Sequence, residues 1–223
     1  MSSDDDPRIR ITTDGPYEVT GRVPLGRTAP IETEYGEPVD WEPFEPLPAG
    51  KRYKLCRCGR SSTKPFCDDS HLDGFDGTEV ADRALRASRI ETFVGDGVVM
   101  TDDLSLCTHA GFCGDRLTRV WEMIEETSDP AIRERLKRMV SLCPSGRLDH
   151  APAPGAPAEE PTFEPSVAIE RNGPIWVRGG IPVVSDDGTT WEVRNRVTLC
   201  RCGRSRNKPF CDGTHQEVGF RDG

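Results

Sequence analysis

The chain has 223 residues and a formal net charge of −9 at pH 7, and it contains 22 Gly and 19 Pro. This acidic balance argues against nucleic-acid binding, which needs a basic surface. No apolar run approaches the roughly 18 residues that cross a bilayer, and the acidic start, residues 1–7, lacks the features of a signal peptide. We therefore expect a cytoplasmic protein with no membrane contact, built from small modules that metal helps to stabilise.

The first predicted module spans residues 8–80. Short β-branched stretches broken by glycine and Gly-Pro, beginning at 11–24, favour strands and turns over helices. Trp41 follows and is interpreted as a core residue of a small sheet rather than an electron relay. A strand-like stretch at 53–55 then leads directly into a group of metal-ligating residues.

That group has the pattern C-x-C-x8-C-x3-H and consists of Cys56, Cys58, Cys67 and His71. Three thiols and one imidazole form a ligand set for a soft or borderline metal. Cys56 and Cys58 lie two apart on an extended segment, so both can reach one metal centre from the same loop. We expect Asp68 to cap a short helix, with Cys67 just before it and His71 in its first turn. The amides at that helix start would face a negatively charged inorganic core.

The middle module is predicted at 88–150. Residues 90–94 and 98–100 are joined by a glycine turn and predict a β-hairpin. Two amphipathic helices should follow, the second one starting at Ser128-Asp129-Pro130 and running to Cys143. Their predicted apolar faces consist of Leu117, Val120, Trp121 and Ile124, and of Ile132, Leu136, Met139 and Val140.

This module also contains a ferredoxin-like set of ligands, Cys107, His109, Cys113 and Cys143. A bacterial ferredoxin has C-x2-C-x2-C followed later by C-P, and here Ala110 takes the place of the central cysteine. Three thiolates suit a 3Fe-4S cluster, whereas His109 or a solvent ligand would complete a 4Fe-4S cluster. The alternatives are a His109 that only forms hydrogen bonds and a metal-free module with buried free cysteines.

Residues 151–165 contain five prolines and predict a stiff, extended linker. The second module, residues 166–223, then repeats the first. Its residues 169–182 match 11–24, and Trp191 takes the place of Trp41. The motif recurs with the same residue at twelve of its sixteen positions, which makes chance a poor explanation. The repeated ligands are Cys200, Cys202, Cys211 and His215.

All nine cysteines therefore fall into three groups of three. An odd number excludes a fully paired internal disulfide framework, and without a secretory signal reduced thiols are expected. Basic residues surround the two repeated motifs. We interpret them as compensating cluster charge and aiding solubility, rather than as a docking patch. They are Arg57, Arg60, Lys64, Arg201, Arg204, Arg206 and Lys208.

The repeated motif resembles the CDGSH iron-sulfur family, the mitoNEET-like proteins, whose signature is C-x-C-x2-S-x3-P-x-C-D-G-[ST]-H. Both copies carry its Cys, Ser, Pro, Asp and His positions, and Asp69 departs from the usual glycine. The resemblance implies one 2Fe-2S cluster per copy. Cys56 and Cys58 would hold one iron and Cys67 and His71 the other. Cys200, Cys202, Cys211 and His215 would repeat this arrangement.

The middle segment resembles the divergent single-cluster 4Fe-4S ferredoxin domain, through C-x-H-x-G-x-C and the later Cys143-Pro-Ser-Gly146. The resemblances imply two 2Fe-2S clusters and one 3Fe-4S or 4Fe-4S cluster. The expected fold class is α+β. Small, β-rich, metal-stabilised CDGSH modules, each with short strands and one short helix, should flank a small α+β ferredoxin-like insert.

A neutral imidazole in place of one thiolate makes a site less negative and favours its reduced state. Potentials should fall between about −400 mV for all-cysteine centres and the range of roughly −150 to +300 mV for Rieske centres with two histidines. Because histidine must be neutral to ligate, acid should weaken its bond and promote cluster loss.

Three functions follow as alternatives. The first is one-electron transfer with a redox partner protein. The second is cluster storage, donation to an apo iron-sulfur acceptor, or redox sensing. The third is a structural zinc scaffold, because Cys3His is also an ordinary zinc ligand set. The sequence contains no nucleotide-binding or hydrolase signature, so an enzyme with its own substrate ranks last among the functions considered. We also expect the two CDGSH modules to pair within one chain, with a homo-oligomer as the alternative.

Overall fold

The computed structural model describes residues 6–222, so most of the acidic start (residues 1–5) and Gly223 lie outside the described residues. Short strands predominate and the helices are few and short, which confirms the predicted α+β class. The chain forms two compact units. The repeat unit comprises residues 6–29, 43–83 and 163–222, and the middle unit comprises 30–42 and 84–162. Among the described residues, no helix has the length and apolar character needed to cross a membrane.

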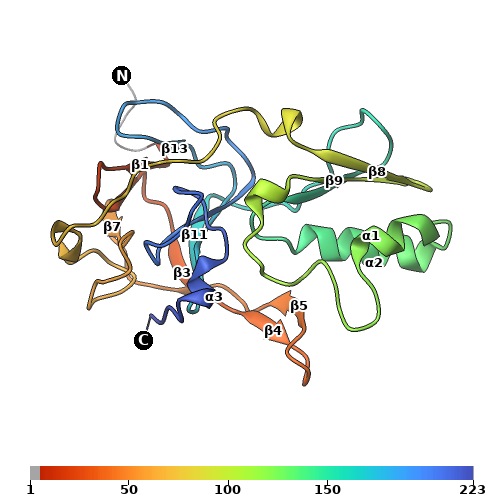
Figure 1. Cartoon of the computed structure of the whole chain (residues 1–223), viewed down its shortest axis with the longest axis horizontal. Helices are drawn as coiled ribbons and strands as arrows, with labels where there is room; N and C mark the ends of the chain where they lie inside the picture. The colour runs from red at the N-terminus through yellow and green to blue at the C-terminus, as the bar shows by residue number, and fades with distance from the viewer. Residues whose placement is uncertain (1–5, 223) are drawn as a thin grey trace. The chain divides into compact units, whose positions relative to one another are not determined.

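The repeat unit contains two sheets, and each extends over residues of both sequence repeats (Figure 1). The first has the order β13-β1-β2-β7 and the second has the order β14-β12-β11-β3-β6. The strands of the first sheet are β1 (Arg8–Ile11), β2 (Tyr17–Thr20), β7 (Tyr53–Leu55) and β13 (Val183–Val184). The strands of the second are β3 (Leu25–Thr28), β6 (Glu45–Pro46), β11 (Ser166–Glu170), β12 (Ile175–Arg178) and β14 (Arg196–Leu199).

The two repeats exchange one strand each. β3 of the first repeat pairs in parallel with β11 of the second, with Leu25 opposite Val167. β13 of the second repeat pairs in parallel with β1 of the first, with Ile9 opposite Val183. Neither sheet can therefore form from one repeat alone. The inward side chains of these strands are almost fully buried, among them Ile9, Ile11, Tyr17, Val19, Leu55, Ile169, Ile175 and Leu199.

The middle unit contains a three-stranded sheet and two α-helices. The sheet has the order β10-β9-β8, and the β8–β9 pair confirms the predicted hairpin. Its strands are β8 (Glu91–Gly95), β9 (Val98–Asp102) and β10 (Leu148–Ala151), and its α-helices are α1 (Val120–Met123) and α2 (Pro130–Ser141). The shared core consists of Val98, Met100, Val120, Met123, Ile124, Leu136, Val140 and Leu148.

The second predicted helix is confirmed in detail. Pro130 is its first residue and the Asp129 side chain accepts a hydrogen bond from the Ala131 amide at 2.8 Å. The first predicted helix is shorter than expected. Leu117 precedes it and is 89% exposed, so its assignment to the apolar face was wrong. Short helices complete the chain: η1 (Ser70–Leu72), η2 (Arg86–Ser88), η3 (Leu104–Leu106), η4 (Ile124–Glu126) and α3 (Thr214–Glu217).

A hairpin of the first repeat belongs to the middle unit. Strands β4 (Pro30–Glu32) and β5 (Pro38–Trp41) pair with each other, and Trp41 stacks on Phe112 with ring centroids 4.8 Å apart. Its indole also donates to the Leu142 carbonyl oxygen at 3.0 Å. Trp191, by contrast, is buried in the repeat unit against Phe210. The two tryptophans therefore occupy different environments, although the repeat places them in register.

Candidate metal centres

Each repeated motif forms a loop that closes on the strand before it. In the first repeat, the Cys56 amide donates to the Pro65 carbonyl oxygen at 2.8 Å, and the Cys67 amide donates to the Lys54 carbonyl oxygen at 3.0 Å. The Ser61 hydroxyl ties the loop centre to the Phe66 carbonyl oxygen at 2.6 Å. These bonds bring all four ligands to one end of β7. The second repeat has the same bonds at Cys200, Cys211 and Ser205.

The ligand atoms lie in pairs. In site one, the sulfur atoms of Cys56 and Cys58 are 3.8 Å apart, and Cys67 Sγ lies 3.4 Å from His71 Nδ1. Two sulfur ligands of one tetrahedral metal lie roughly 3.8 Å apart, and a sulfur and a nitrogen ligand lie roughly 3.5 Å apart, when metal–ligand bonds are about 2.3 and 2.0 Å. Each pair can thus bind one metal ion. Site two has the same distances between Cys200 and Cys202 and between Cys211 and His215.

The two pairs of a site do not converge on a single point. Among the described residues, the one group of three ligand atoms within 4.8 Å of one another is Cys67, Asp69 and His71. No three of the four cysteine and histidine ligands of a site meet this limit. A mononuclear tetrahedral centre would need all four to do so. The donor set therefore fits two metal ions better than one.

The helix after the third cysteine begins one residue later than predicted, so Asp68 precedes the N-cap position of η1, which Asp69 occupies without a side-chain capping bond. Asp68 Oδ1 still accepts from the Ser70 amide at 3.1 Å. In the second repeat Asp212 accepts from the Thr214 amide at 3.0 Å, and Gly213 occupies the N-cap position of α3. Asp68 and Asp212 therefore hold the turn between the cysteine and histidine ligands.

Two of the basic residues near the motifs are buried, so the solubility interpretation was wrong for them. Arg57 and Arg201 are each 2% exposed. Arg57 donates to the carbonyl oxygens of Thr12 and Gly77. Arg201 donates to the Glu170 carbonyl oxygen at 2.6 Å and pairs with Asp222 at 2.8 Å. Each arginine sits between two ligand cysteines in sequence and anchors its ligand loop to neighbouring backbone.

The two sites differ in exposure. Cys211 and His215 are 3% and 6% exposed, whereas Cys67 and His71 are only partly buried. Burial raises the pKa of the thiols of Cys67 and Cys211, and the rise is large for Cys211. Without metal these thiols hold their protons, so metal must displace protons to bind.

In the middle unit, the predicted ligands Cys107, Cys113 and Cys143 line one cavity. Burial raises the pKa of the Cys113 thiol. His109 also lines this cavity, is exposed, and has a positive φ of 58°. Ala110, at the position of the missing cysteine, also lines the cavity. The three sulfurs are not all within 4.8 Å of one another, which suits a polynuclear cluster better than a single ion.

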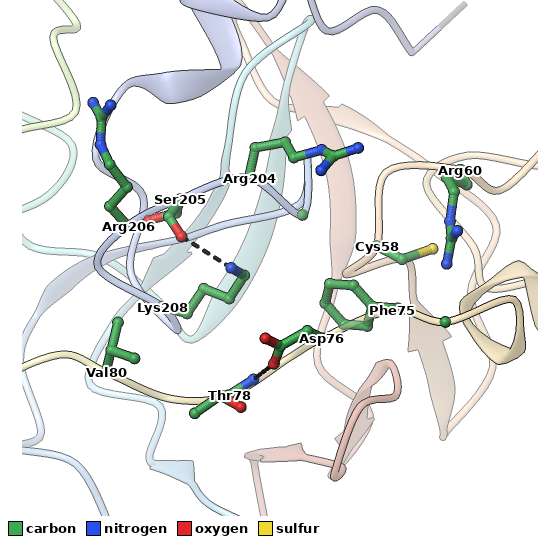
Figure 2. A pocket seen from close by; sticks show the side chains of 12 residues that line it. Cys58, Arg60, Phe75, Asp76, Thr78, Val80, Arg204, Ser205, Arg206 and Lys208 are labelled. Atoms are coloured by element: carbon green, nitrogen blue, oxygen red, sulfur yellow. Dashed lines mark hydrogen bonds between the residues drawn. The ribbon is translucent and has the colours of Figure 1, made fainter.

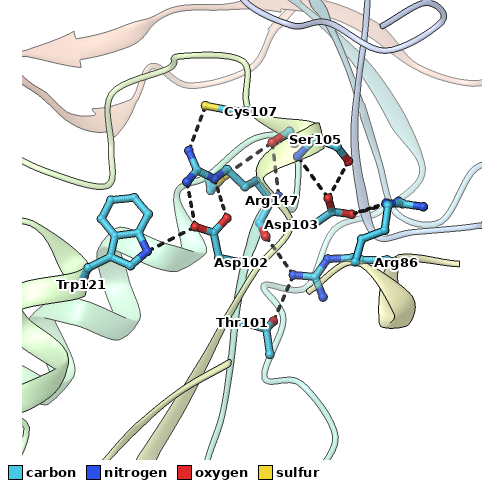
Figure 3. A network of polar contacts seen from close by, with 11 residues as sticks. Arg86, Thr101, Asp102, Asp103, Ser105, Cys107, Trp121 and Arg147 are labelled. Atoms are coloured by element: carbon cyan, nitrogen blue, oxygen red, sulfur yellow. Dashed lines mark hydrogen bonds and ion pairs between the residues drawn. The ribbon is translucent and has the colours of Figure 1, made fainter. Parts of the chain in front are cut away.

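One ligand of this cavity has a charged partner that the sequence analysis missed. The Arg147 guanidinium donates to Cys107 Sγ at 3.0 Å (Figure 3). Asp102 binds the same guanidinium at 2.6 and 2.7 Å, and also accepts from the Trp121 indole at 3.2 Å. The Arg86 guanidinium donates a hydrogen bond to the Arg147 carbonyl oxygen at 2.9 Å. Asp102 therefore orients the guanidinium of Arg147, and the Arg86 bond holds the backbone of Arg147.

Comparison with known proteins finds family matches over both kinds of site. Residues 14–72 and 172–216 match the family described as "Iron-binding zinc finger CDGSH type", and residues 93–152 match the family described as "Divergent 4Fe-4S mono-cluster". The fold and the ligand groups thus define an iron-sulfur protein. More particularly, the chain carries two CDGSH-type domains with a divergent 4Fe-4S domain between them, which confirms the family resemblance of the sequence.

A mouse protein, "CDGSH iron-sulfur domain-containing protein 3, mitochondrial" from Mus musculus, is 62% identical over 26 residues. This match covers 12% of the chain and 19% of the mouse protein. No solved structure matches the chain.

Proposed function

We propose that this protein is a one-electron carrier with two 2Fe-2S clusters in 3Cys-1His sites and a third, 3Fe-4S or 4Fe-4S, cluster in the middle unit. The paired ligand geometry is the observation that carries this proposal. Two pairs with tetrahedral spacing, too far apart to share one ion, match the two irons of a binuclear cluster. The clusters supply one-electron redox chemistry, and the protein holds, insulates and tunes them.

Contact between the ligand loops supports electron transfer between the two repeated sites. A Cβ built on Gly203 would lie 2.4 Å from the Cys58 carbonyl oxygen. The Tyr17 hydroxyl, from the first repeat, donates to the Cys200 carbonyl oxygen at 2.8 Å. Ligand backbones from both repeats are therefore packed together, and an electron on either site has a short path to the other.

We infer that the redox partner is an acidic protein that docks at a groove beside Cys58. Both repeats contribute to this groove (Figure 2). Four basic side chains line it, from Arg60, Arg204, Arg206 and Lys208, with Asp76 as the carboxylate among them. This local excess of cations favours an acidic partner surface, and the net charge of −9 of the whole chain disfavours a nucleic acid or an anionic membrane. For these four residues the proposal replaces our interpretation from sequence, which preferred charge compensation to docking.

Cluster storage, or donation to an apo iron-sulfur acceptor, is the second candidate function. The partial exposure of Cys67 and His71 supports it, because an acceptor needs access to the outer ligands. We also propose that the protein acts in the cytoplasm and has no substrate of its own.

Anaerobic iron, sulfide and zinc analysis with visible and EPR spectra tests the proposal. Two 2Fe-2S clusters give about four irons per chain, and a middle cluster raises this to about seven or eight. Reversible one-electron reduction supports the carrier function, whereas cluster release to an acceptor without redox cycling supports donation. Stoichiometric zinc without labile sulfide would overturn both candidates.

A further inference from the structure

The two repeated sites differ in one side chain next to the ligands. Asp69 and Gly213 occupy equivalent positions, and both have left-handed backbone, with φ of 66° and 84°. Their amides also make equivalent contacts, to Cys67 Sγ at 3.4 Å and to Cys211 Sγ at 3.5 Å. Aspartate is among the side chains that adopt this conformation most readily. The backbone of the turn is thus the same, and site one differs by a carboxylate.

That carboxylate, with Cys67 and His71, forms a group of three potential metal ligands. Asp69 Oδ1 lies 3.8 Å from Cys67 Sγ, which is itself 3.4 Å from His71 Nδ1. All three ligand atoms lie within 4.8 Å of one another. The edges of a tetrahedral zinc site with sulfur, oxygen and nitrogen ligands are roughly 3.4 to 3.8 Å. One ion can therefore contact all three side chains with small movements and keep a water as its fourth ligand.

The Asp69 carboxylate is available for such an ion. Within the described chain its polar side-chain partner is the Cys67 thiol. The neighbouring carboxylate of Asp68 is already occupied, because it accepts hydrogen bonds from Ser62 and Ser70. Asp69 is also exposed, whereas the corresponding turn of site two is buried and has no carboxylate at Gly213.

We propose that Cys67, Asp69 and His71 form a binding site for a single divalent ion of the borderline class, such as Zn²⁺, Co²⁺ or Fe²⁺, once the inorganic core has left site one. The mixed sulfur, nitrogen and oxygen donors favour these ions over Mg²⁺ or Ca²⁺. Binding displaces the Cys67 thiol proton to solvent. Site one is therefore the metal-exchanging site of the pair. The inference rests on the proposed function in one respect, that a cluster occupies site one before the divalent ion binds there.

Co²⁺ is a suitable probe, because a tetrahedral thiolate complex is coloured. The full-length protein is loaded with clusters, analysed for iron and sulfide, and then exposed to oxidant with Co²⁺ present. We expect one Co²⁺ per chain after desalting, with sulfur-to-cobalt charge transfer. Asp69→Asn keeps the turn and removes the charge, and Asp69→Gly restores the residue of site two. Both variants should bind Co²⁺ at least tenfold more weakly.

Circular dichroism of each variant verifies that the turn and sheets remain folded. Two Co²⁺ ions per chain with equal affinity, no Co²⁺ at all, or unchanged affinity in folded Asp69→Asn would each overturn the proposal. Failure of this proposal can be distinguished from failure of the proposed function. The iron and sulfide analysis before oxidation tests whether clusters are present, and a protein that lacks clusters can still be titrated with Co²⁺ to test the ion site.

Discussion

Gly59 lies directly against the backbone of Cys202: a Cβ built on Gly59 would fall 2.5 Å from the Cys202 carbonyl oxygen. The reciprocal contact, of Gly203 with Cys58, has almost the same distance, 2.4 Å. Both glycines follow a ligand cysteine and both have positive φ, 79° and 76°. The two Cys-x-Cys loops can approach this closely only because neither position carries a side chain.

Gly203→Ala should therefore destabilise the repeat unit by more than its backbone conformation alone requires. A positive φ costs alanine about 1 to 2 kcal/mol, and forcing a methyl group into packed backbone adds roughly 1 to 3 kcal/mol. Gly188→Ala is the matched control, since its φ is 85° and nothing lies within 4 Å of the added Cβ. Denaturant unfolding of the loaded proteins measures the difference. Equal losses in the two variants would contradict the packed contact.

Local sequence features predicted the local structure well. The Asp129-Pro130 start of α2 and the glycine turn of the β8–β9 hairpin need only neighbouring residues, and both were confirmed. The repeated ligand spacing likewise identified the CDGSH-type regions, which the family comparison confirmed. In each case the local structure is determined by residues that are close together in the sequence.

Long-range relationships were not predictable from these patterns. The exchange of β3 and β13 depends on pairing between residues more than 140 positions apart, such as Leu25 and Val167. Trp41 was assigned by its register in the repeat, but it packs on Phe112, which has no counterpart in that repeat. Arg147 and Cys107 are 40 residues apart in sequence. Spacing alone contains no signal for such contacts.

Replacing a histidine ligand should change one site and leave the other as an internal reference. His71→Cys adds a thiolate to site one, which makes the cluster more negative and lowers its potential by on the order of 100 mV. The variant should also retain its cluster at lower pH, because site one then has no imidazole ligand that acid can protonate and detach from the metal. His215→Cys should do the same at site two. EPR-monitored redox titration measures both potentials, and an unchanged value would exclude ligation by that histidine.

Ionisation of Glu170 should lower the free energy of unfolding as the pH rises from mildly acidic to neutral. Burial raises its pKa to about 7, whereas an unfolded glutamate titrates near about 4.3. Between these values the folded state binds more protons than the unfolded state, so stability decreases as pH rises from about 4.5 to 7 and is level above that. The loss amounts to roughly 3.5 kcal/mol.

Glu170→Gln removes this titration. The difference in unfolding free energy between the variant and the natural chain should therefore grow from pH 5 to 7 and then remain constant. Glu45→Gln, at an exposed position, serves as the control and should follow the natural chain throughout. If the Glu170→Gln profile runs parallel to that of the natural chain, the carboxyl group ionises without cost in the folded state.

Arg147 should raise the potential of the middle cluster, because its guanidinium donates to Cys107 Sγ at 3.0 Å and stabilises added negative charge. Arg147→Gln should lower that potential by on the order of tens of millivolts. Arg147→Lys keeps the charge but loses the planar pair with Asp102, so an intermediate value is expected. Arg86→Gln is the control, since Arg86 bonds the Arg147 carbonyl oxygen and the Thr101 hydroxyl. Spectroelectrochemical titration of the four proteins separates these cases. If the potential of the middle cluster shifts equally in Arg86→Gln and Arg147→Gln, then general loosening of the hydrogen-bond network, rather than loss of the bond to sulfur, causes the shift.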